Sequence, residues 1–228
     1  MSNLILPDWI SERLAQGREF RRMVQPMQRR SDADEAPDAG DCVVEGYATT
    51  FNQFYTLWAD DSLTVEEQVD ARAFDACDMS DVIMQYDHHG RVFARNKNGT
   101  LNVTPDEHGL KAVATLGGTE LGRQVYEEIK GGYSDKMSFA FTVKEDKLED
   151  VEDHETGRVT VRRTILKIAK LYDVSVVSIP ANDATEIFAR GMADGAISWA
   201  AQELRAIEAR RKAYLWLQLQ LRLKGANS

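Results

Sequence analysis

Cysteine is scarce in this chain of 228 residues, which has only two, Cys42 and Cys77. Two cysteines are too few for a disulfide framework, and their spacing is not that of metal ligands. Neither lies in a local pattern typical of a catalytic thiol. We therefore expect both to be reduced and semi-buried, and to take no part in chemistry.

Long hydrophobic runs are also missing. No run reaches the roughly 18 apolar residues that a transmembrane helix needs, and the N-terminus lacks the charged start and apolar stretch of a secretory signal. The 28 basic residues are outnumbered by 37 acidic ones, for a formal charge of -9, which argues against a general affinity for nucleic-acid phosphates. We expect a cytoplasmic protein with no membrane contact and no direct nucleic-acid binding.

Composition divides the chain into three regions. Residues 1–41 form an N-terminal arm, with an amphipathic pattern that predicts a helix over 8–24 and an acidic linker at 31–41. Residues 42–190 form the core. Residues 191–228 are rich in Ala, Glu, Arg and Leu and predict a long C-terminal helix. A helix with that much apolar surface needs a partner, so we expect a homo-oligomer, a dimer, formed through helices.

The core region is dominated by short runs rich in β-branched and aromatic residues. Such runs predict strands at 42–51, 82–86, 109–116, 137–143, 158–166 and 174–179. One segment differs, because Thr119 can cap a helix in which Leu121, Val125 and Ile129 recur every fourth residue before a glycine pair. The patterns together predict an α+β fold, with a β-barrel-like core and helices around it.

Two of the four histidines are neighbours in Tyr86-Asp-His-His-Gly90, directly after an apolar strand. A strand end suits a general base, which must be held rigidly and still reach the substrate. A solvated polar turn is the simpler interpretation of these residues alone. A metal site or a manganese phosphoesterase is a further reading, but adjacent strand residues point to opposite faces and separate aspartate motifs are not evident.

Ser138 is the serine with the best setting for nucleophilic attack. It lies in Met137-Ser-Phe-Ala-Phe141, where alternation puts Met137, Phe139 and Phe141 on one face and Ser138 on the other. A small polar filler in a strand is the simpler interpretation. No Gly-x-Ser-x-Gly elbow is present, which argues against an α/β-hydrolase.

A third polar group is needed to orient an imidazole, and Asp173 is the candidate. It stands where the apolar strand of Leu171-Tyr-Asp-Val-Ser-Val-Val-Ser-Ile-Pro-Ala181 begins. An acidic residue at that point is often a strand cap instead. Ser175 could form a hydrogen bond within the same site.

The histidine, serine and aspartate segments, taken in this order, resemble the three motif blocks of the caudovirus prohead protease family. The resemblance covers roughly residues 42–190 and includes Val44-Glu-Gly-Tyr-Ala-Thr-Thr-Phe-Asn52, which is similar to the family's opening strand. Family members are similar in fold to the herpesvirus assemblins, so the resemblance implies a β-barrel surrounded by helices.

The resemblance implies a serine endopeptidase that cleaves the scaffold, the capsid protein's scaffolding segment and itself. It would act inside the assembling procapsid, in the host cytoplasm, and no cofactor is implied. Carried over by position, the family's histidine falls on His88, its serine on Ser138 and its acidic residue on Asp173. Many relatives have Glu at the acidic position and assemblins have a second histidine there, so His89 and His108 are rivals for the third role.

The implied chemistry is acyl transfer, in which His88 takes the proton of Ser138 as the hydroxyl attacks a peptide carbonyl. Backbone amides beside Ser138, or near Arg162 and Arg163, are candidate donors of an oxyanion hole. The alternative is a non-catalytic scaffold or assembly protein with a protease-like fold, which would act on the phage capsid or scaffold protein through its helices alone.

Overall fold

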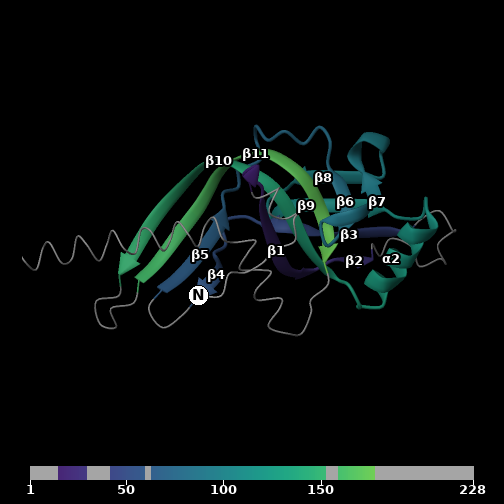
Figure 1. The fold of residues 1–228 in the computed structure, drawn as a ribbon, viewed down its shortest axis with the longest axis horizontal. Helices are drawn as coiled ribbons and strands as arrows, with labels where there is room; N and C mark the ends of the chain where they lie inside the picture. Colours follow the sequence, from purple (N-terminus) through teal and green to yellow (C-terminus); the bar gives the residue numbers. More distant parts are fainter. Residues whose placement is uncertain (1–14, 30–41, 60–62, 153–158, 178–228) are drawn as a thin grey trace, which may run out of the picture.

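A computed structural model of the chain describes residues 15–29, 42–59, 63–152 and 159–177 (Figure 1). The described part is mostly β-strand, with a single α-helix, α2 (Glu120–Lys130), and one 3-10 turn, η1 (Asn96–Asn98). The strands are β1 (Glu19–Pro26), β2 (Gln28–Arg29), β3 (Val43–Thr50), β4 (Tyr55–Ala59), β5 (Leu63–Val69), β6 (Ile83–Tyr86), β7 (His89–Arg95), β8 (Leu101–Pro105), β9 (Gly109–Thr115), β10 (Lys136–Glu152) and β11 (Val159–Val177).

The strands form two sheets. The larger has the order β1-β10-β11-β5-β4, with β6 also paired to β11 and β7 paired to β6, and the smaller has the order β2-β3-β9-β8. Figure 1 shows β10 and β11 as an arched ribbon along the molecule, with β4 and β5 at one end and the smaller sheet and α2 at the other. The first part of β11 pairs with β5 and its last part with β6, both in parallel. One long strand therefore joins the two ends.

The hydrophobic core draws on both sheets and α2. Met137, Phe139 and Phe141 of β10 are fully buried in it, which confirms that their side chains share one face of the strand. Gly46 of β3 allows a close approach here, because a Cβ at this position would lie 2.8 Å from the sulfur of Met137 and 3.1 Å from the Cα of Met27. The glycine thus lets the two sheets pack tightly behind the strand that carries Ser138.

Helix α2 begins and ends where its sequence predicts. The backbone N–H of Gly122 donates to the Thr119 side chain at 2.9 Å, and the N–H of Gly131 donates to the carbonyl of Glu127 at the other end. Val125 and Ile129 are buried against the core. The helix covers one end of the sheets and leads into β10.

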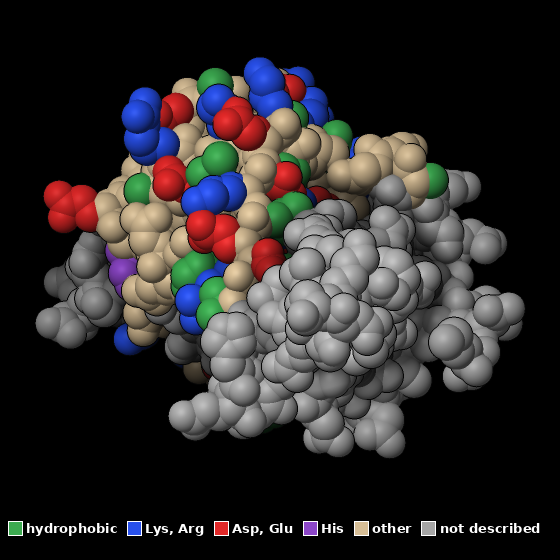
Figure 2. Space-filling model, turned by 90° about the vertical axis from the view of Figure 1, so that its left-hand side faces the viewer, with side chains coloured by type: hydrophobic (Ala, Val, Ile, Leu, Met, Phe, Trp, Pro, Cys, Tyr) green, Lys and Arg blue, Asp and Glu red, His purple; other side chains and the backbone are tan. Residues whose placement is uncertain are grey.

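The tip of the β10–β11 ribbon extends away from this core. An exposed ion pair between Lys167 and Glu145 links the two strands of the ribbon, and Lys147 pairs with Glu149 within β10. Figure 2 looks at the molecule from this side and shows Lys or Arg and Asp or Glu side chains interspersed over the described surface. Cross-strand pairing therefore supports a strand whose residues are too polar to enter a core.

The expected α+β fold, a barrel-like core surrounded by helices, is wrong for the described residues. They form two sheets that share one core, with one short helix at an end. The helix predicted over 8–24 is also wrong from Glu19 onward, where β1 pairs with β10 instead. The predicted C-terminal helix at 191–228 falls outside the described residues, which hold no long helix. None of the helices in the described ranges is long and apolar enough to cross a membrane.

Candidate active site

His88 is presented by a tight hairpin turn. Strands β6 and β7 are joined by Asp87 and His88 alone, and these two residues have φ angles of +47° and +58°. A two-residue hairpin turn of this type requires positive φ at both positions, and Asp and His are among the non-glycine residues that tolerate it best. The imidazole therefore extends from a rigid turn.

Three contacts anchor this hairpin beside β10 and β11. The N–H of Asp87 donates to the carbonyl of Val176 at 2.9 Å, and Tyr86 pairs with Val176 in the ladder. The hydroxyl of Tyr86 lies 3.0 Å from the Ser134 hydroxyl, in the segment that leads into β10. The turn is thus tied to both strands that carry the other candidate residues.

Ser138 and Asp173 lie on the same face of the large sheet. In the antiparallel ladder Ser138 of β10 is opposite Ser175 of β11, and Ala140 is opposite Asp173. Opposed residues of an antiparallel pair share a face, and residues two apart along a strand do so as well. The serine and the aspartate therefore stand next to each other, on the face opposite to Met137 and the core.

The His88 ring bridges these two side chains. Its Nδ1 lies 2.5 Å from Oδ1 of Asp173, and its Nε2 lies 2.6 Å from Oγ of Ser138. A carboxylate only accepts hydrogen bonds, so Nδ1–H donates to Asp173 and Nε2 accepts from the Ser138 hydroxyl. The three side chains are 0%, 2% and 2% exposed for His88, Ser138 and Asp173, so the chain of hydrogen bonds is enclosed.

Asp173 has a second donor in the site. The hydroxyl of Ser175 donates to the same Oδ1 at 2.7 Å, and Ser175 is fully buried. Burying a carboxylate costs free energy unless it is hydrogen bonded, and here both the imidazole and the Ser175 hydroxyl donate hydrogen bonds to it. The hydrogen bond within the site that the sequence suggested for Ser175 is present.

Phe20 is a contact of the site that the sequence did not indicate. Its ring lies 4.8 Å from the His88 ring, centre to centre, at an angle of 68°. Phe20 belongs to β1 and is buried at 2% exposure. In the sequence Phe20 is one apolar residue of the pattern that predicts a helix over 8–24, and that pattern gives no link to the histidine.

The rival residues for the third role have different surroundings. His89 is exposed on β7, and the exposed His108 ring packs against Tyr47 of the smaller sheet at 4.5 Å.

Arg163, near which the sequence suggested oxyanion-hole amides, lies well along the ribbon from Ser138 and forms ion pairs with Glu19 and other carboxylates. Its segment therefore has no position near the serine from which to form an oxyanion hole.

Within the described part of the chain, the other reactive side chains form no second cluster of metal-ligating groups. Burial raises the pKa of the Cys77 thiol to about 11, the opposite of what activates a nucleophilic thiol. The described ranges contain no group of three or more His, Cys, Asp and Glu that could hold a metal ion. Both ring nitrogens of His88 are already hydrogen bonded to Ser138 and Asp173, which does not fit a metal ligand.

A hydroxyl, an imidazole and a carboxylate hydrogen bonded in this order have the geometry of the triad of serine hydrolases. In keeping with that class, the family model for caudovirus prohead serine proteases matches residues 27–196. The chain belongs to this family, as the three motif blocks of the sequence had indicated. No curated protein and no solved structure matches the chain significantly.

Proposed function

We propose that this protein is a serine endopeptidase that cleaves the capsid protein or the scaffold protein of a tailed phage, and itself, during head assembly. The observation that carries the proposal is the His88 ring, which is hydrogen bonded to Ser138 through one nitrogen and to Asp173 through the other. Membership of the prohead serine protease family supports a peptidase that acts in the assembling procapsid.

In the proposed reaction Ser138 attacks the carbonyl carbon of a peptide bond while Nε2 of His88 takes the hydroxyl proton. Asp173 holds the tautomer with hydrogen on Nδ1 and stabilises the imidazolium as it forms. The protonated Nε2 then gives its proton to the leaving amine, which departs with the C–N bond broken. Water attacks the acyl-enzyme by the same route and releases the second product.

The free-energy cost of this backbone turn and of the buried polar side chains supports a functional role for them. Two consecutive non-glycine residues, Asp87 and His88, adopt positive φ angles, and an enclosed carboxylate is held by two donors. Apolar side chains of similar volume would generally stabilise a protein as well as such a buried polar group. Strained backbone and buried polar groups of this kind cluster at active sites.

The test is the coexpression of the protein with the major capsid protein of the same phage, followed by intact-mass measurement of both chains. We expect discrete capsid-protein fragments and self-trimming with the wild type, and full-length chains with Ser138→Ala. His108→Ala is the matched control for histidine loss and should cut like the wild type. Identical masses for wild type and Ser138→Ala would instead support a non-catalytic assembly protein.

A further inference from the structure

The candidate active site is closed in this structure. Ser138 is 2% exposed and His88 is fully buried, yet a nucleophile must come within about 3–3.5 Å of the carbonyl carbon that it attacks. If the protein is the peptidase proposed above, on which this inference rests, some element must move before a peptide can reach Ser138. That element must be able to move while the three hydrogen-bonded side chains stay in place.

Among the elements that the structure describes, strand β1 meets this condition. Ser138 is on β10, which pairs with β11, and Asp173 is on β11, which pairs with β10 and β6. The His88 hairpin is tied to β11 and to Ser134. By contrast β1 is the end strand of its sheet, with β10 as its neighbour, and the hydrogen bonds that join the three triad side chains do not involve it.

Strand β1 also lies directly beside the site, in the same sheet as Ser138. In the antiparallel register Arg22 is opposite Ser138 and Phe20 is opposite Ala140, so Phe20 is on the same face of the sheet as the serine. Its ring packs against the imidazole of His88. The departure of β1 would uncover the ring that must accept the serine proton.

We propose that β1 occupies the edge of β10 at which the substrate binds, and that an extended segment of the substrate protein takes its place. Without β1, residues 136–141 of β10 would present unpaired backbone N–H and C=O groups beside Ser138. Such an edge binds an extended peptide by adding it as a new strand. The closed form is then a resting state in which the protein's own strand fills the substrate position.

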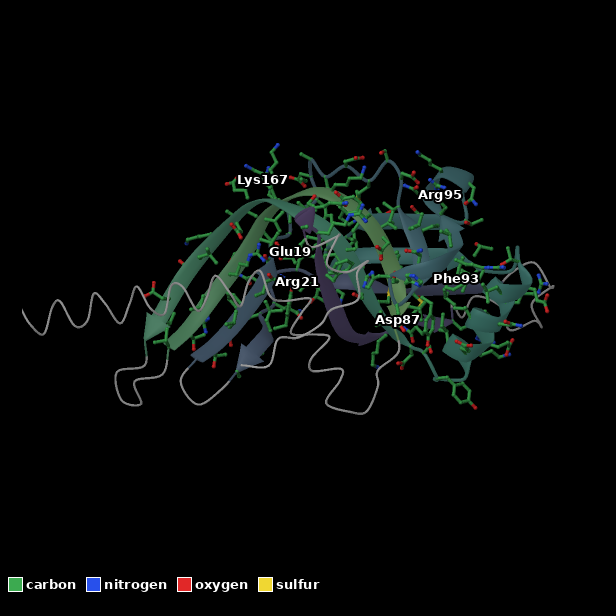
Figure 3. All side chains as sticks on the ribbon, viewed as in Figure 1. Glu19, Arg21, Asp87, Phe93, Arg95 and Lys167 are labelled. Atoms are coloured by element: carbon green, nitrogen blue, oxygen red, sulfur yellow. The ribbon has the colours of Figure 1, made fainter. Side chains whose placement is uncertain are left out.

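A buried ion cluster on the opposite face of β1 holds the strand in place. Arg21 forms hydrogen bonds of 2.5 and 2.8 Å with Glu67 of β5, and Glu19 forms hydrogen bonds of 2.6 and 2.9 Å with Arg163 of β11. Figure 3 shows Glu19 and Arg21 next to each other and apart from Asp87, which marks the histidine turn. These pairs hold β1 to β5 and β11 while Phe20 faces the site.

If β1 leaves with Glu19 and Arg21, the charged residues that remain in the cluster are still paired. Arg163 also lies 3.0 Å from Glu67, and the hydroxyl of Tyr55 donates to Glu67 at 2.6 Å. Removal of one partner is most damaging where it leaves a buried charge unpaired, and this is avoided here. The ion pairs of Glu19 and Arg21 therefore set how often β1 leaves, and weakening them should open the site.

The experiment measures the rate at which an alkyl fluorophosphonate, a small serine-directed reagent, labels Ser138 in the full chain. We expect labelling to be roughly tenfold faster in Glu19→Gln than in the wild type, the order of effect of losing charge-assisted hydrogen bonds. Phe20→Ala should also be faster. Glu145→Gln removes a carboxylate from an exposed ion pair on the same ribbon and is the matched control, with the wild-type rate.

The outcomes separate this inference from the proposed function. Labelling of the wild type with no acceleration in Glu19→Gln would overturn the role of β1 and leave the peptidase standing. No labelling of Ser138 in any variant would contradict the peptidase itself. Hydrogen exchange of the wild type gives an independent readout, because the amides of residues 19–25 should exchange faster than those of residues 173–177. Equal protection of the two segments would also overturn the inference.

Discussion

Ser175→Ala removes a single hydroxyl from the site and tests how far the buried carboxylate depends on it. In the wild type Oδ1 of Asp173 accepts from the Ser175 hydroxyl at 2.7 Å and from Nδ1–H of His88 at 2.5 Å. Alanine fits the position and removes this donor, while the hydrogen bond from the imidazole is kept. Since Asp173 is 2% exposed, water has little access with which to replace the lost donor.

The expected loss can be worked from the hydrogen bond. A hydrogen bond to a charged group contributes about 1.5–3 kcal/mol, and about 1.4 kcal/mol corresponds to a factor of ten in rate. Because Asp173 keeps its bond to the imidazole, we expect the lower end of that range, a loss of roughly tenfold in kcat. The loss should fall on kcat with KM unchanged, because Ser175 acts on the imidazole through Asp173 and not on the bound peptide.

The assay is the initial rate of capsid-protein cleavage over a range of substrate concentrations. Thr164→Ala is the control, since it removes a hydroxyl from the same strand, where Thr164 accepts a hydrogen bond from Gln68 at 3.0 Å, far from Ser138. A wild-type kcat in Ser175→Ala, or the same loss in Thr164→Ala, would refute the reasoning about Asp173.

Three further predictions follow from the site and the ion cluster. His88→Ala should abolish cleavage of the capsid protein, and His108→Ala should leave the rate of cleavage near that of the wild type. Cleavage that survives the loss of His88 would exclude this histidine as the general base. Arg21→Gln should lower the free energy of unfolding by about 3 kcal/mol. This is the low end of the range for breaking a buried ion pair, because Arg163 still forms a hydrogen bond with Glu67. An unchanged midpoint of urea unfolding would contradict this prediction. Burial alone would raise the pKa of the Glu19 carboxyl, but hydrogen bonds and ion pairs with two arginines outweigh it and hold the pKa below its usual value. The ionised Glu19 therefore contributes fully to the free energy of unfolding above about pH 4.3, and this contribution is lost as the pH falls further. The difference in unfolding free energy between wild type and Glu19→Gln should accordingly shrink on acidification. A difference that grows on acidification would contradict this prediction.

The parts of the fold that were predicted from the sequence depend on local patterns. The N-cap at Thr119 and the four-residue spacing in α2 predict that helix, and runs of β-branched and aromatic residues predict strands at β3 and β9. The full length of β10 was missed because its second half, up to Glu152, is highly charged and has the composition of a loop. Pairing with β11 makes it a strand, and pairing across a sheet is not visible in a single sequence.

The residues of the site likewise include some that the sequence predicts and one that it does not. His88, Ser138 and Asp173 were selected because each lies at or beside a strand and because the three segments occur in the order of a known family, and the structure brings the three side chains together. Phe20 was missed, since its contact with His88 exists only because β1 pairs with β10. Tertiary pairing overrode the helical periodicity of that segment.

The most direct test of the central claim is to find which residue a serine-directed reagent modifies. After reaction with a fluorophosphonate, digestion and peptide mass mapping should locate a single adduct on Ser138. The adduct should be absent from Ser138→Ala and strongly reduced in His88→Ala, because the hydroxyl needs the imidazole to take its proton. An adduct on another serine, or capsid-protein cleavage by a protein whose Ser138 stays unmodified, would contradict the account.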